Sequence, residues 1–412
     1  MKITLATIGS RGDVQPVIAL GLGLKEAGHT VGIMAPPDFQ SFVESYGFTY
    51  YPLGKSMKEI MDENLEIYGK ASIPMKRVRD IMHKQLEAQF EQIPDKARDS
   101  DLLIGAGPLF GGISVAQMLN IPYFYIVFSP NFFPSREYPP SMTTPNQDMA
   151  CWRNKLIWFV GKFFNNKFFK QHLNRVRKKY RLPPIKDYTT YLNSADNLVT
   201  IDQEIAPVPQ DVKARYSQIP PLLLSAENQS LDPAIENFLK SGPAPIYIGF
   251  GSMPIANPQE ATSMLIEIAA ELKIRMIIDK GWAELGNVTI PENILVISGA
   301  PHDLLFPRTA GVIHHAGAGT LSTAARAGVP QIAIPTAFDQ FYLAKRIFVT
   351  GIGPKACPIF QLTKDYLLSA VQEIITNQAM IQKAKDLGAL LSPKNGVEEA
   401  LKIIEAKVKG GK

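Results

Sequence analysis

The sequence predicts an α/β fold made of two parallel-sheet domains, and three observations lead to this prediction. Short apolar runs alternate with helix-like stretches along the whole chain, a pattern typical of parallel sheets built from strand–helix–strand units. The chain has 412 residues, which is long enough for two domains. The proline-containing segment 217–225 separates two such series and predicts a linker. We therefore expect domains at 1–217 and 218–412, with a ligand-binding cleft between them.

The expected strands are apolar runs that end at glycines, prolines or polar residues. In the first domain they are 3–8, 30–34, 102–105 and 122–127. In the second domain they are 245–249, 275–279, 294–297, 311–314 and 331–334. The run 16–24 reads as the helix that follows the first strand, so residues 9–13 form a strand-to-helix turn.

The composition is that of an ordinary globular protein, with 46% hydrophobic and 20% charged residues. The first residues read as a buried strand and lack the cleavage pattern of a signal peptide, and no apolar stretch reaches the length of a membrane-spanning helix. Cys151 and Cys357 are the two cysteines, which excludes a disulfide framework and a zinc site. A net charge of +5 is modest. These features predict a cytoplasmic protein.

The run from Val312 to Thr320 is the most informative part of the chain. An apolar strand enters a glycine-rich turn, and a helix leaves it, so backbone N–H groups and the positive end of a helix dipole face the same point. Gly317 and Gly319, on either side of Ala318, let the backbone approach an anion without a Cβ collision. His315 can add a hydrogen-bond donor or a positive charge, and Thr320 a hydroxyl. The turn predicts a diphosphate site.

Asp339 and Gln340 follow the next apolar run, 331–334. They are therefore expected at the carboxyl ends of the strands, where open α/β sheets bind ligands. An acid–amide pair can bracket neighbouring hydroxyl groups, so the expected ligand is a diphosphate that carries a sugar. A nicotinamide or flavin site is the alternative, but its third glycine is replaced by Ser322 and it gives the paired histidines no role. His314 by itself is expected to be a half-buried strand residue.

These residues resemble the donor site of inverting, nucleotide-sugar-dependent glycosyltransferases of the GT-B fold. The most similar subgroup includes sterol and lipid glucosyltransferases and the transferases of glycopeptide antibiotics. The resemblance covers almost the whole chain, in family order, and its further motifs are 8–16, 249–253, 281–284, 300–302 and 326–330. It implies two Rossmann-like parallel-sheet domains that face each other across a cleft, with the acceptor bound by 1–217 and the nucleotide sugar by 218–412. It also implies a last helix, about 397–407, that packs back on the first domain.

Asp13 is the expected catalytic base. Inverting transfer needs a group that takes the proton of the acceptor hydroxyl, and a carboxylate within hydrogen-bond reach can do this. The matching residue is an aspartate in the antibiotic and sterol branch. Asp13 could instead cap the helix, and one aspartate can do both. Ser10, Arg11 and Gly12 are expected to approach the diphosphate from the other side of the cleft, although Arg11 could also be a surface side chain.

Other donor contacts come from the resemblance. Ser252 is expected near the phosphate and Trp282 near the base, where a core position is the alternative for the tryptophan. Ala300 and His302 match the stretch that reads the base edge. The glutamate that holds the ribose in plant members is Thr323 here, which leaves open whether the donor is based on uridine or deoxythymidine diphosphate. The expected donor is UDP-glucose.

The sequence predicts no bound metal and no cofactor besides the nucleotide sugar. Asp99-Ser-Asp101 matches a metal-binding pattern formally, but it precedes the strand 102–105 and so lies at the amino end of that strand. Ligand sites lie at the opposite end of such sheets. The turn amides with His315 and Thr320 could stabilise the leaving diphosphate instead.

The acceptor side is aromatic and basic. Residues 152–181 contain ten Lys or Arg, eight aromatic residues and no acid. This pattern predicts a basic amphipathic helix that contacts an anionic membrane, at the inner face of a membrane in a cytoplasmic protein. The alternatives are a helix that buries its aromatic residues and a nucleic-acid surface, for which no motif is present. Phe110, Phe128 and Phe132 are the expected acceptor contacts and favour a bulky, hydrophobic acceptor such as a sterol, lipid or polycyclic natural product.

The sequence thus predicts an inverting, metal-independent hexosyltransferase. Two alternatives from other classes remain at this stage. One is a GT-B relative that binds a nucleotide sugar but performs another reaction, such as 2-epimerisation. The other is an inactive binding module, which the joint presence of Asp13, His315, Asp339 and Gln340 disfavours.

Overall fold

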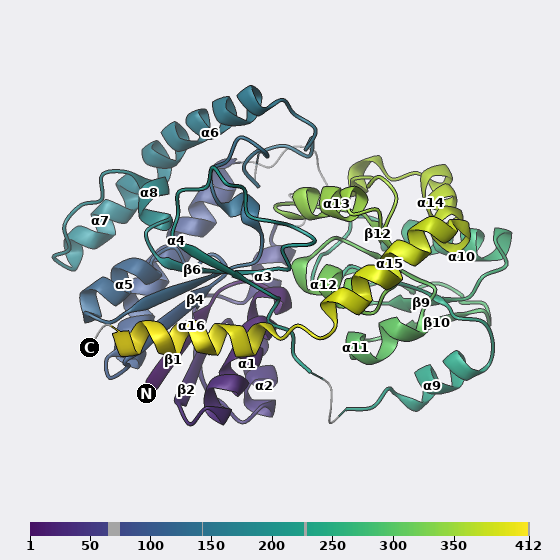
Figure 1. Cartoon of the computed structure of the whole chain (residues 1–412), viewed down its shortest axis with the longest axis horizontal. Helices are drawn as coiled ribbons and strands as arrows, with labels where there is room; N and C mark the ends of the chain where they lie inside the picture. Colours follow the sequence, from purple (N-terminus) through teal and green to yellow (C-terminus); the bar gives the residue numbers. More distant parts are fainter. Residues whose placement is uncertain (65–74, 142, 226–228, 411–412) are drawn as a thin grey trace.

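The computed structural model describes residues 1–64, 75–141, 143–225 and 229–410 and contains two parallel sheets, each packed between helices (Figure 1). The seven-stranded sheet has the order β3-β2-β1-β4-β5-β6-β7, and the five-stranded sheet has the order β10-β9-β8-β11-β12. Every strand pairing is parallel, as expected when a helix connects each strand to the next. The predicted α/β class with two parallel-sheet domains is confirmed.

The strands of the first sheet are β1 (Lys2–Thr7), β2 (Thr30–Ala35), β3 (Thr49–Pro52), β4 (Leu102–Ala106), β5 (Tyr123–Val127), β6 (Asp196–Thr200) and β7 (Tyr216–Ile219). Those of the second sheet are β8 (Ile246–Gly249), β9 (Met276–Asp279), β10 (Ile294–Ile297), β11 (Gly311–His314) and β12 (Gln331–Ala333). All nine strands predicted from apolar runs are present, with ends that agree to within one residue. The strands β3, β6 and β7 were not predicted.

The helices beside the first sheet are α1 (Arg11–Glu26), α2 (Gln40–Ser45), α3 (Met57–Asp62), α4 (Met75–Ala97), α5 (Gly112–Leu119), α6 (Cys151–Asn165), α7 (Gln171–Lys179) and α8 (Tyr188–Leu192). Those beside the second are α9 (Pro233–Lys240), α10 (Pro258–Glu271), α11 (His302–Leu305), α12 (Ala318–Arg326), α13 (Gln340–Val349), α14 (Lys364–Thr376) and α15 (Gln378–Leu391), and the last helix is α16 (Gly396–Gly410). Short turns used below are η3 (Pro130–Phe132), η4 (Asn166–Lys170) and η5 (Gly281–Ala283).

The predicted linker needs a correction. The first residues of 217–225 belong to β7, which pairs with β6 at the edge of the first sheet. The strand was missed because its four residues, Tyr216 to Ile219, include two polar side chains and run directly into two prolines. The last strand of the first sheet therefore ends at Ile219. The predicted division of the chain at 217/218 falls inside this strand, and we now propose a boundary directly after it.

The last helix, α16, lies against α1 of the first domain (Figure 1). Ala400 and Ile404 are fully buried in the same core cluster as Val17 and Leu20. The close approach requires a glycine, because a Cβ atom at Gly23 of α1 would collide with the side chain of Val397. Among the described residues, no helix is long and apolar enough to cross a membrane.

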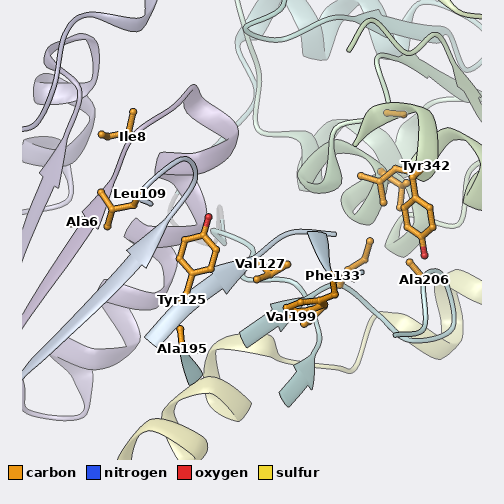
Figure 2. Close-up of a cluster of buried hydrophobic side chains, with 14 of the residues drawn as sticks. Ala6, Ile8, Leu109, Tyr125, Val127, Phe133, Ala195, Val199, Ala206 and Tyr342 are labelled. Carbon is orange, nitrogen blue, oxygen red and sulfur yellow. The ribbon is translucent and has the colours of Figure 1, made fainter. Parts of the chain in front are cut away.

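The two sheets are joined by a continuous core and by ion pairs. One hydrophobic cluster combines Val127 and Phe133 of the first domain with Tyr342 of α13 in the second (Figure 2). Arg326, at the end of α12, binds Asp202 through two hydrogen bonds of 2.6 and 3.0 Å, and the Asp202 side chain is fully buried. These contacts fix how the carboxyl ends of the two sheets face each other.

Candidate functional site

Asp13 lies in the first turn of α1, directly after β1. Ser10 is the residue that caps the helix, and the Ser10 backbone N–H donates to the Asp13 carboxylate at 2.8 Å. Asp13 therefore takes part in a capping box, which satisfies an N–H group that the helix leaves unpaired. One of the two carboxylate oxygens makes this bond, so the other remains for a second partner. The capping role that the sequence allowed is present in the structure.

The walls around Asp13 come from three neighbouring strands and the turns that follow them. Gly9 and Gly107 both have positive φ angles, 135° and 64°, and a Cβ atom at either position would crowd the Asp13 carboxylate. Tyr125, in the middle of β5, donates its hydroxyl proton to the Gly107 carbonyl and lies near enough to Asp13 for that carboxylate to raise its pKa. Burial by these walls raises the pKa of Asp13 to about 7, and the negative charge of Asp339 adds to the increase. Gly107 and Tyr125 were not found from the sequence.

Asp339 faces Asp13 from the second domain. It precedes α13 in a turn where Phe338 has a positive φ of 57°, a backbone conformation that side chains other than glycine rarely adopt. Burial raises the pKa of Asp339 to about 6. Two carboxylates from different domains thus lie near enough for the charge of Asp339 to influence Asp13, and each has a pKa near neutrality. Paired carboxyl groups of this kind occur at sites that move protons or bind hydroxyl groups.

The side chain of Gln340, the first residue of α13, makes most of its hydrogen bonds within the protein. Its side-chain oxygen accepts hydrogen bonds from the Thr336 hydroxyl at 2.8 Å and from the backbone N–H groups of Thr336 and Ala337 at 2.8 and 3.2 Å. These bonds hold the turn that carries Asp339. The side-chain nitrogen is the part of Gln340 that can act toward a ligand.

Arg11 brings a positive charge to the same cleft from the first domain. It is exposed in the first turn of α1, with its guanidinium 4.8 Å from the centre of the Phe42 ring. It lies near enough to Asp279 and His302 of the second domain to influence their pKa values. Ser10 and Gly12 flank it at the start of the helix. Arg11 is thus an exposed side chain close to the second domain, and its approach to a diphosphate stays a prediction.

His315 occupies the centre of the glycine-rich turn after β11. Its ring lies between Gly251, in the turn after β8, and Gly317, where a Cβ atom would collide with the ring. Burial lowers its pKa to about 4, so the imidazole is neutral at pH 7 and acts as a donor through one N–H group. The Nδ1 atom is buried and has no partner within the described part of the chain. A buried polar atom without a partner is costly, so this atom indicates a ligand at the turn.

The helix α12 starts at Ala318, with Gly317 as its cap. The N–H groups of Ala318, Gly319 and Thr320 belong to the first turn of this helix, where no carbonyl of the same helix can accept them. A Cβ atom at Gly319 would face open space, so packing within the protein does not explain the glycine there. Ala316 holds a positive φ of 65° just before the turn, a strained conformation of the kind found at binding sites. The geometry suits an anion.

His314 is a strand residue, as expected, but it is completely buried rather than half-buried. It lies at the end of β11, and its ring binds Gln331 of β12 at 2.8 Å and the backbone N–H of Ala316 at 3.1 Å. These two bonds tie the glycine-rich turn after β11 to the neighbouring strand.

A buried network that the sequence did not predict lies beside the turn. The hydroxyl of Tyr247, in β8, donates to Asp279 at 3.1 Å and lies 3.0 Å from Nε2 of His302. Asp279 also accepts the backbone N–H of Gly281 at 3.2 Å. The His302 ring stacks on Phe306 at 4.3 Å, and burial lowers its pKa to about 4. His302 is thus fixed by the protein, and one ring nitrogen points away from Tyr247.

Ser252, Trp282 and Ala300 lie in the turns that follow β8, β9 and β10. Ser252 and Ala300 are partly exposed there. The Trp282 backbone N–H donates to Gly251 at 2.9 Å, and its side chain packs against the core cluster of the first domain that contains Val14 and Phe39. Trp282 is therefore a contact between the domains, close to the alternative that the sequence left open for it.

Phe110, Phe128 and Phe132 follow the ends of β4 and β5, on the Asp13 side of the cleft. All three are partly buried. The Phe132 ring packs against Tyr125 at 5.4 Å. One ring contact therefore joins Phe132 to Tyr125, which lies near Asp13.

Asp99 and Asp101 lie at the opposite end of the first sheet. Asp101 accepts the backbone N–H of Lys2 at 2.7 Å, and Asp99 is 3.5 Å from the Lys2 side chain. Both are therefore remote from Asp13, at the amino ends of β1 and β4. Within the described ranges, no group of three or more His, Cys, Asp or Glu side chains is arranged to hold a metal ion.

Two family models match the chain. Residues 3–136 match the glycosyltransferase family 28 N-terminal domain, and residues 263–404 match the C-terminal domain of erythromycin biosynthesis protein CIII-like proteins. The chain is 33% identical to the vancomycin aglycone glucosyltransferase of Amycolatopsis orientalis, over 86% of this chain and 85% of that protein. This chain belongs to the same glycosyltransferase family.

Sterol 3-beta-glucosyltransferases are also relatives of this glycosyltransferase. One from Arabidopsis thaliana is 31% identical over 97% of this chain, and one from Komagataella phaffii is 30% identical over 98%. The chain spans 67% of the length of the plant relative and 34% of the yeast relative. Among solved structures, the glycosyltransferase of kitacinnamycin has a TM-score of 0.76 at 18% identity over 98% of both chains, and VinC, solved with dTDP, has a TM-score of 0.69 at 17% identity over 99% of this chain and 100% of that chain. These structures confirm the GT-B fold.

Proposed function

We propose that this glycosyltransferase moves a hexose, glucose from UDP-glucose, to a hydroxyl group of a hydrophobic acceptor with inversion at the anomeric carbon. Two observations carry the proposal: Asp13 and Asp339 come from different domains and lie near enough for the charge of Asp339 to raise the pKa of Asp13, and His315 Nδ1 is buried without a partner in the described part of the chain. One carboxylate comes from each domain, so a sugar bound between them would be held by the second domain and attacked from the first.

In the proposed reaction, the acceptor oxygen attacks the anomeric carbon while the bond from that carbon to the diphosphate oxygen breaks. Asp13 takes the hydroxyl proton through the carboxylate oxygen that the capping box leaves available. The products are the glycoside and UDP, and the proton on Asp13 is then released to solvent. A pKa of about 7 suits this role, because about half of such a base is ionised at neutral pH and the ionised form still binds a proton well.

The diphosphate gains negative charge as it leaves. We propose that the first-turn N–H groups of α12, the neutral His315 and the Thr320 hydroxyl stabilise this charge, with Arg11 approaching from the first domain. Donors that are already oriented stabilise a developing charge without reorganisation. In this proposal the reaction needs neither a metal ion nor a further cofactor.

Asp339 and the side-chain nitrogen of Gln340 are the proposed partners of the hexose hydroxyls. Ala300 and His302 are the proposed contacts of the base, with Ser252 near the phosphate. The position of Trp282 against the first domain favours a role in closing the cleft over the base rather than direct stacking. Thr323 hydrogen-bonds to the Gly319 carbonyl of its own helix at 3.0 Å, so selection between UDP and dTDP rests with other residues.

A sterol, a lipid or a polycyclic natural product is the proposed acceptor. Support comes from the names of the relatives, which act on sterols and on the vancomycin aglycone, and from the aromatic group around Phe132. We place the acceptor in the first domain and the nucleotide sugar in the second. We also propose that the enzyme works in the cytoplasm and at the periphery of a membrane, through the segment 152–181.

Incubation with UDP-glucose labelled in the sugar and a panel of sterols, lipids and glycopeptide aglycones tests the proposal. We expect label in a glycoside whose new bond has the β configuration by NMR, with release of UDP. Conversion of the labelled donor to another UDP-hexose without an acceptor would show an epimerase instead. Binding of UDP without any turnover across the panel would show a binding module.

A further inference from the structure

The outer face of α6 carries a continuous apolar stripe. Six large hydrophobic side chains on this helix are between 42% and 73% exposed, and they are more than half of such side chains in the described part of the chain. They are Trp152, Leu156, Phe159, Val160, Phe163 and Phe164. At about 100° per residue, Trp152, Leu156, Phe159 and Phe163 lie within about 60° of one another around the helix. The exposed cations Lys155 and Lys162 border one side of the stripe.

The inner face of α6 is held by polar contacts. Asn154 is completely buried and donates to the Arg136 carbonyl at 3.0 Å. The Trp158 indole donates to the Tyr138 carbonyl at 2.9 Å. The helix is therefore fixed with its apolar side outward, which is the reverse of an ordinary surface helix. Figure 1 shows α6 along the outer edge of the first domain, away from both sheets.

The rest of the basic segment is not part of this surface. The π-helical stretch η4 joins α6 to α7 without a break in the helical backbone, so the helical segment continues past the exposed stripe as far as Lys179. Phe169 stacks on Tyr188 at 5.6 Å, and Arg177 of α7 is buried with hydrogen bonds to Ser114 and Pro183. The aromatic residues of the segment thus fall into two groups. Some of those that follow α6 pack into the core, and most of those on α6 are exposed to solvent.

We infer that the outer face of α6 docks the enzyme on a bilayer that contains anionic lipids. The helix α6 carries the exposed cations Arg153, Lys155 and Lys162 and no acidic residue, so positive charge borders the stripe. A second copy of this chain fits the face poorly, because a symmetric contact would bring the same cations together. Tryptophan and phenylalanine beside lysine and arginine are the side chains that amphipathic helices place at the interface of a membrane.

Docking through α6 would bring the acceptor side of the cleft close to the lipid. Trp158 is bonded to Tyr138, and the Tyr138 hydroxyl donates to Pro130 at 2.6 Å in the turn η3, which ends at Phe132. Two hydrogen bonds, from Trp158 to Tyr138 and from Tyr138 to Pro130, therefore connect the inner face of α6 to the turn that contains the proposed acceptor contact Phe132. Lipid docking by α6 deepens the membrane contact proposed above for 152–181, and its consequence for the acceptor rests on the proposed hexose transfer.

Vesicle co-sedimentation of the full chain tests the inference. We expect binding to vesicles of phosphatidylcholine and phosphatidylglycerol at a ratio of about 7:3, and a loss of this binding at high salt. Binding to vesicles of phosphatidylcholine alone should be much weaker. The variant with Phe159→Ser and Phe163→Ser should bind at least about tenfold more weakly, since it removes two large apolar side chains from the interface. The variant Phe348→Ser, which changes an exposed phenylalanine at the end of α13, is the matched control and should bind as the parent does.

Three outcomes would overturn the inference. Parent protein that fails to sediment with anionic vesicles at low salt has no lipid-docking face. Equal loss of binding in the Phe348→Ser control would show a general effect of apolar surface. A dimer in light scattering that the Phe159→Ser/Phe163→Ser variant dissociates would assign the face to a second copy. Transfer to a water-soluble acceptor, measured on the same variants, should stay at the parent rate, so a failed docking test is distinguishable from a failed assignment of the reaction.

Discussion

Replacing Asp13 by asparagine removes the proposed base and keeps the local structure. The carboxamide oxygen of asparagine can still accept the Ser10 N–H group that lies 2.8 Å from Asp13, and asparagine caps helices about as well as aspartate. Loss of a general base typically costs about 10²–10⁴ in rate. At about 1.36 kcal/mol per tenfold, this is about 2.7–5.4 kcal/mol of transition-state stabilisation.

Stability should respond differently from activity. At pH 8, Asp13 is held as an anion although its pKa is raised to about 7, so its charge opposes folding there. Asparagine removes this cost and also removes a favourable charge at a helix N-terminus, worth about 0.3–1 kcal/mol. We therefore expect a thermal midpoint that is unchanged or slightly higher. Asp232→Asn is a matched control, because Asp232 caps α9 by accepting the Ala234 N–H at 2.8 Å.

The assay is UDP release at pH 8 with saturating donor, beside the affinity for UDP measured by calorimetry. We expect Asp13→Asn to bind UDP as the parent does and to turn over about 10²–10⁴ times more slowly. Asp232→Asn should retain full activity. A rate for Asp13→Asn within about threefold of the parent, with intact folding, would refute the reasoning and leave Asp13 as a capping residue.

Four further predictions concern the same cleft. Transfer should fall as the pH drops below about 7, because Asp13 becomes protonated there. Asp339→Asn should move this decline in the residual activity to lower pH, because it removes a neighbouring negative charge. An unchanged pH profile in this variant would show that the charge of Asp339 does not influence Asp13. His315→Ala should weaken UDP binding and slow transfer by about 10²–10³, and survival of both would make His315 structural. Asp339→Ala should weaken UDP-glucose binding much more than UDP binding, whereas equal losses by calorimetry would point to the ribose or to misfolding. Transfer should persist in EDTA, and its loss with rescue by Mg²⁺ would contradict the metal-free mechanism.

The sequence predicted the strands of the second domain well because each is a short apolar run that ends at a turn. It failed at β3 and β6, which contain polar residues or proline. Thr49–Pro52 ends in proline at the edge of the sheet, and Asp196–Thr200 begins with two polar residues. Edge pairing and contacts with the rest of the fold decide these strands, and neither leaves an apolar run in the sequence.

The individual turns of the candidate site could be predicted from the sequence, but their surroundings could not. Asp13, His315 and Asp339 each follow a recognisable strand. Gly107 and Tyr125 reach Asp13 only because β4 and β5 lie beside β1 in the sheet. The bond from Tyr247 to His302 joins residues that are 55 positions apart. Such contacts depend on strand order, which a local pattern does not contain.

The outward orientation of α6 shows another limit of pattern reading. A stripe of aromatic residues at helical spacing is compatible with burial and with exposure. The decision rests on Asn154 and Trp158, whose polar atoms bind two backbone carbonyls and so turn the opposite face toward the protein. Side chains of mixed character on the inner face gave no sign of this in the sequence.

The helix α12 connects the two ends of the cleft in a way that affects its mechanics. Its amino end forms the donor turn, and its carboxyl end carries Arg326, bound to the fully buried Asp202 of the other domain. Breaking a buried ion pair by removing one partner typically costs about 3–5 kcal/mol. The nine residues of α12 therefore form a rigid helical link between the glycine-rich turn and the ion pair. In the proposed function, a nucleotide sugar that shifts the amino end of this helix strains or reseats the ion pair at its other end, so donor binding is expected to change the angle between the domains.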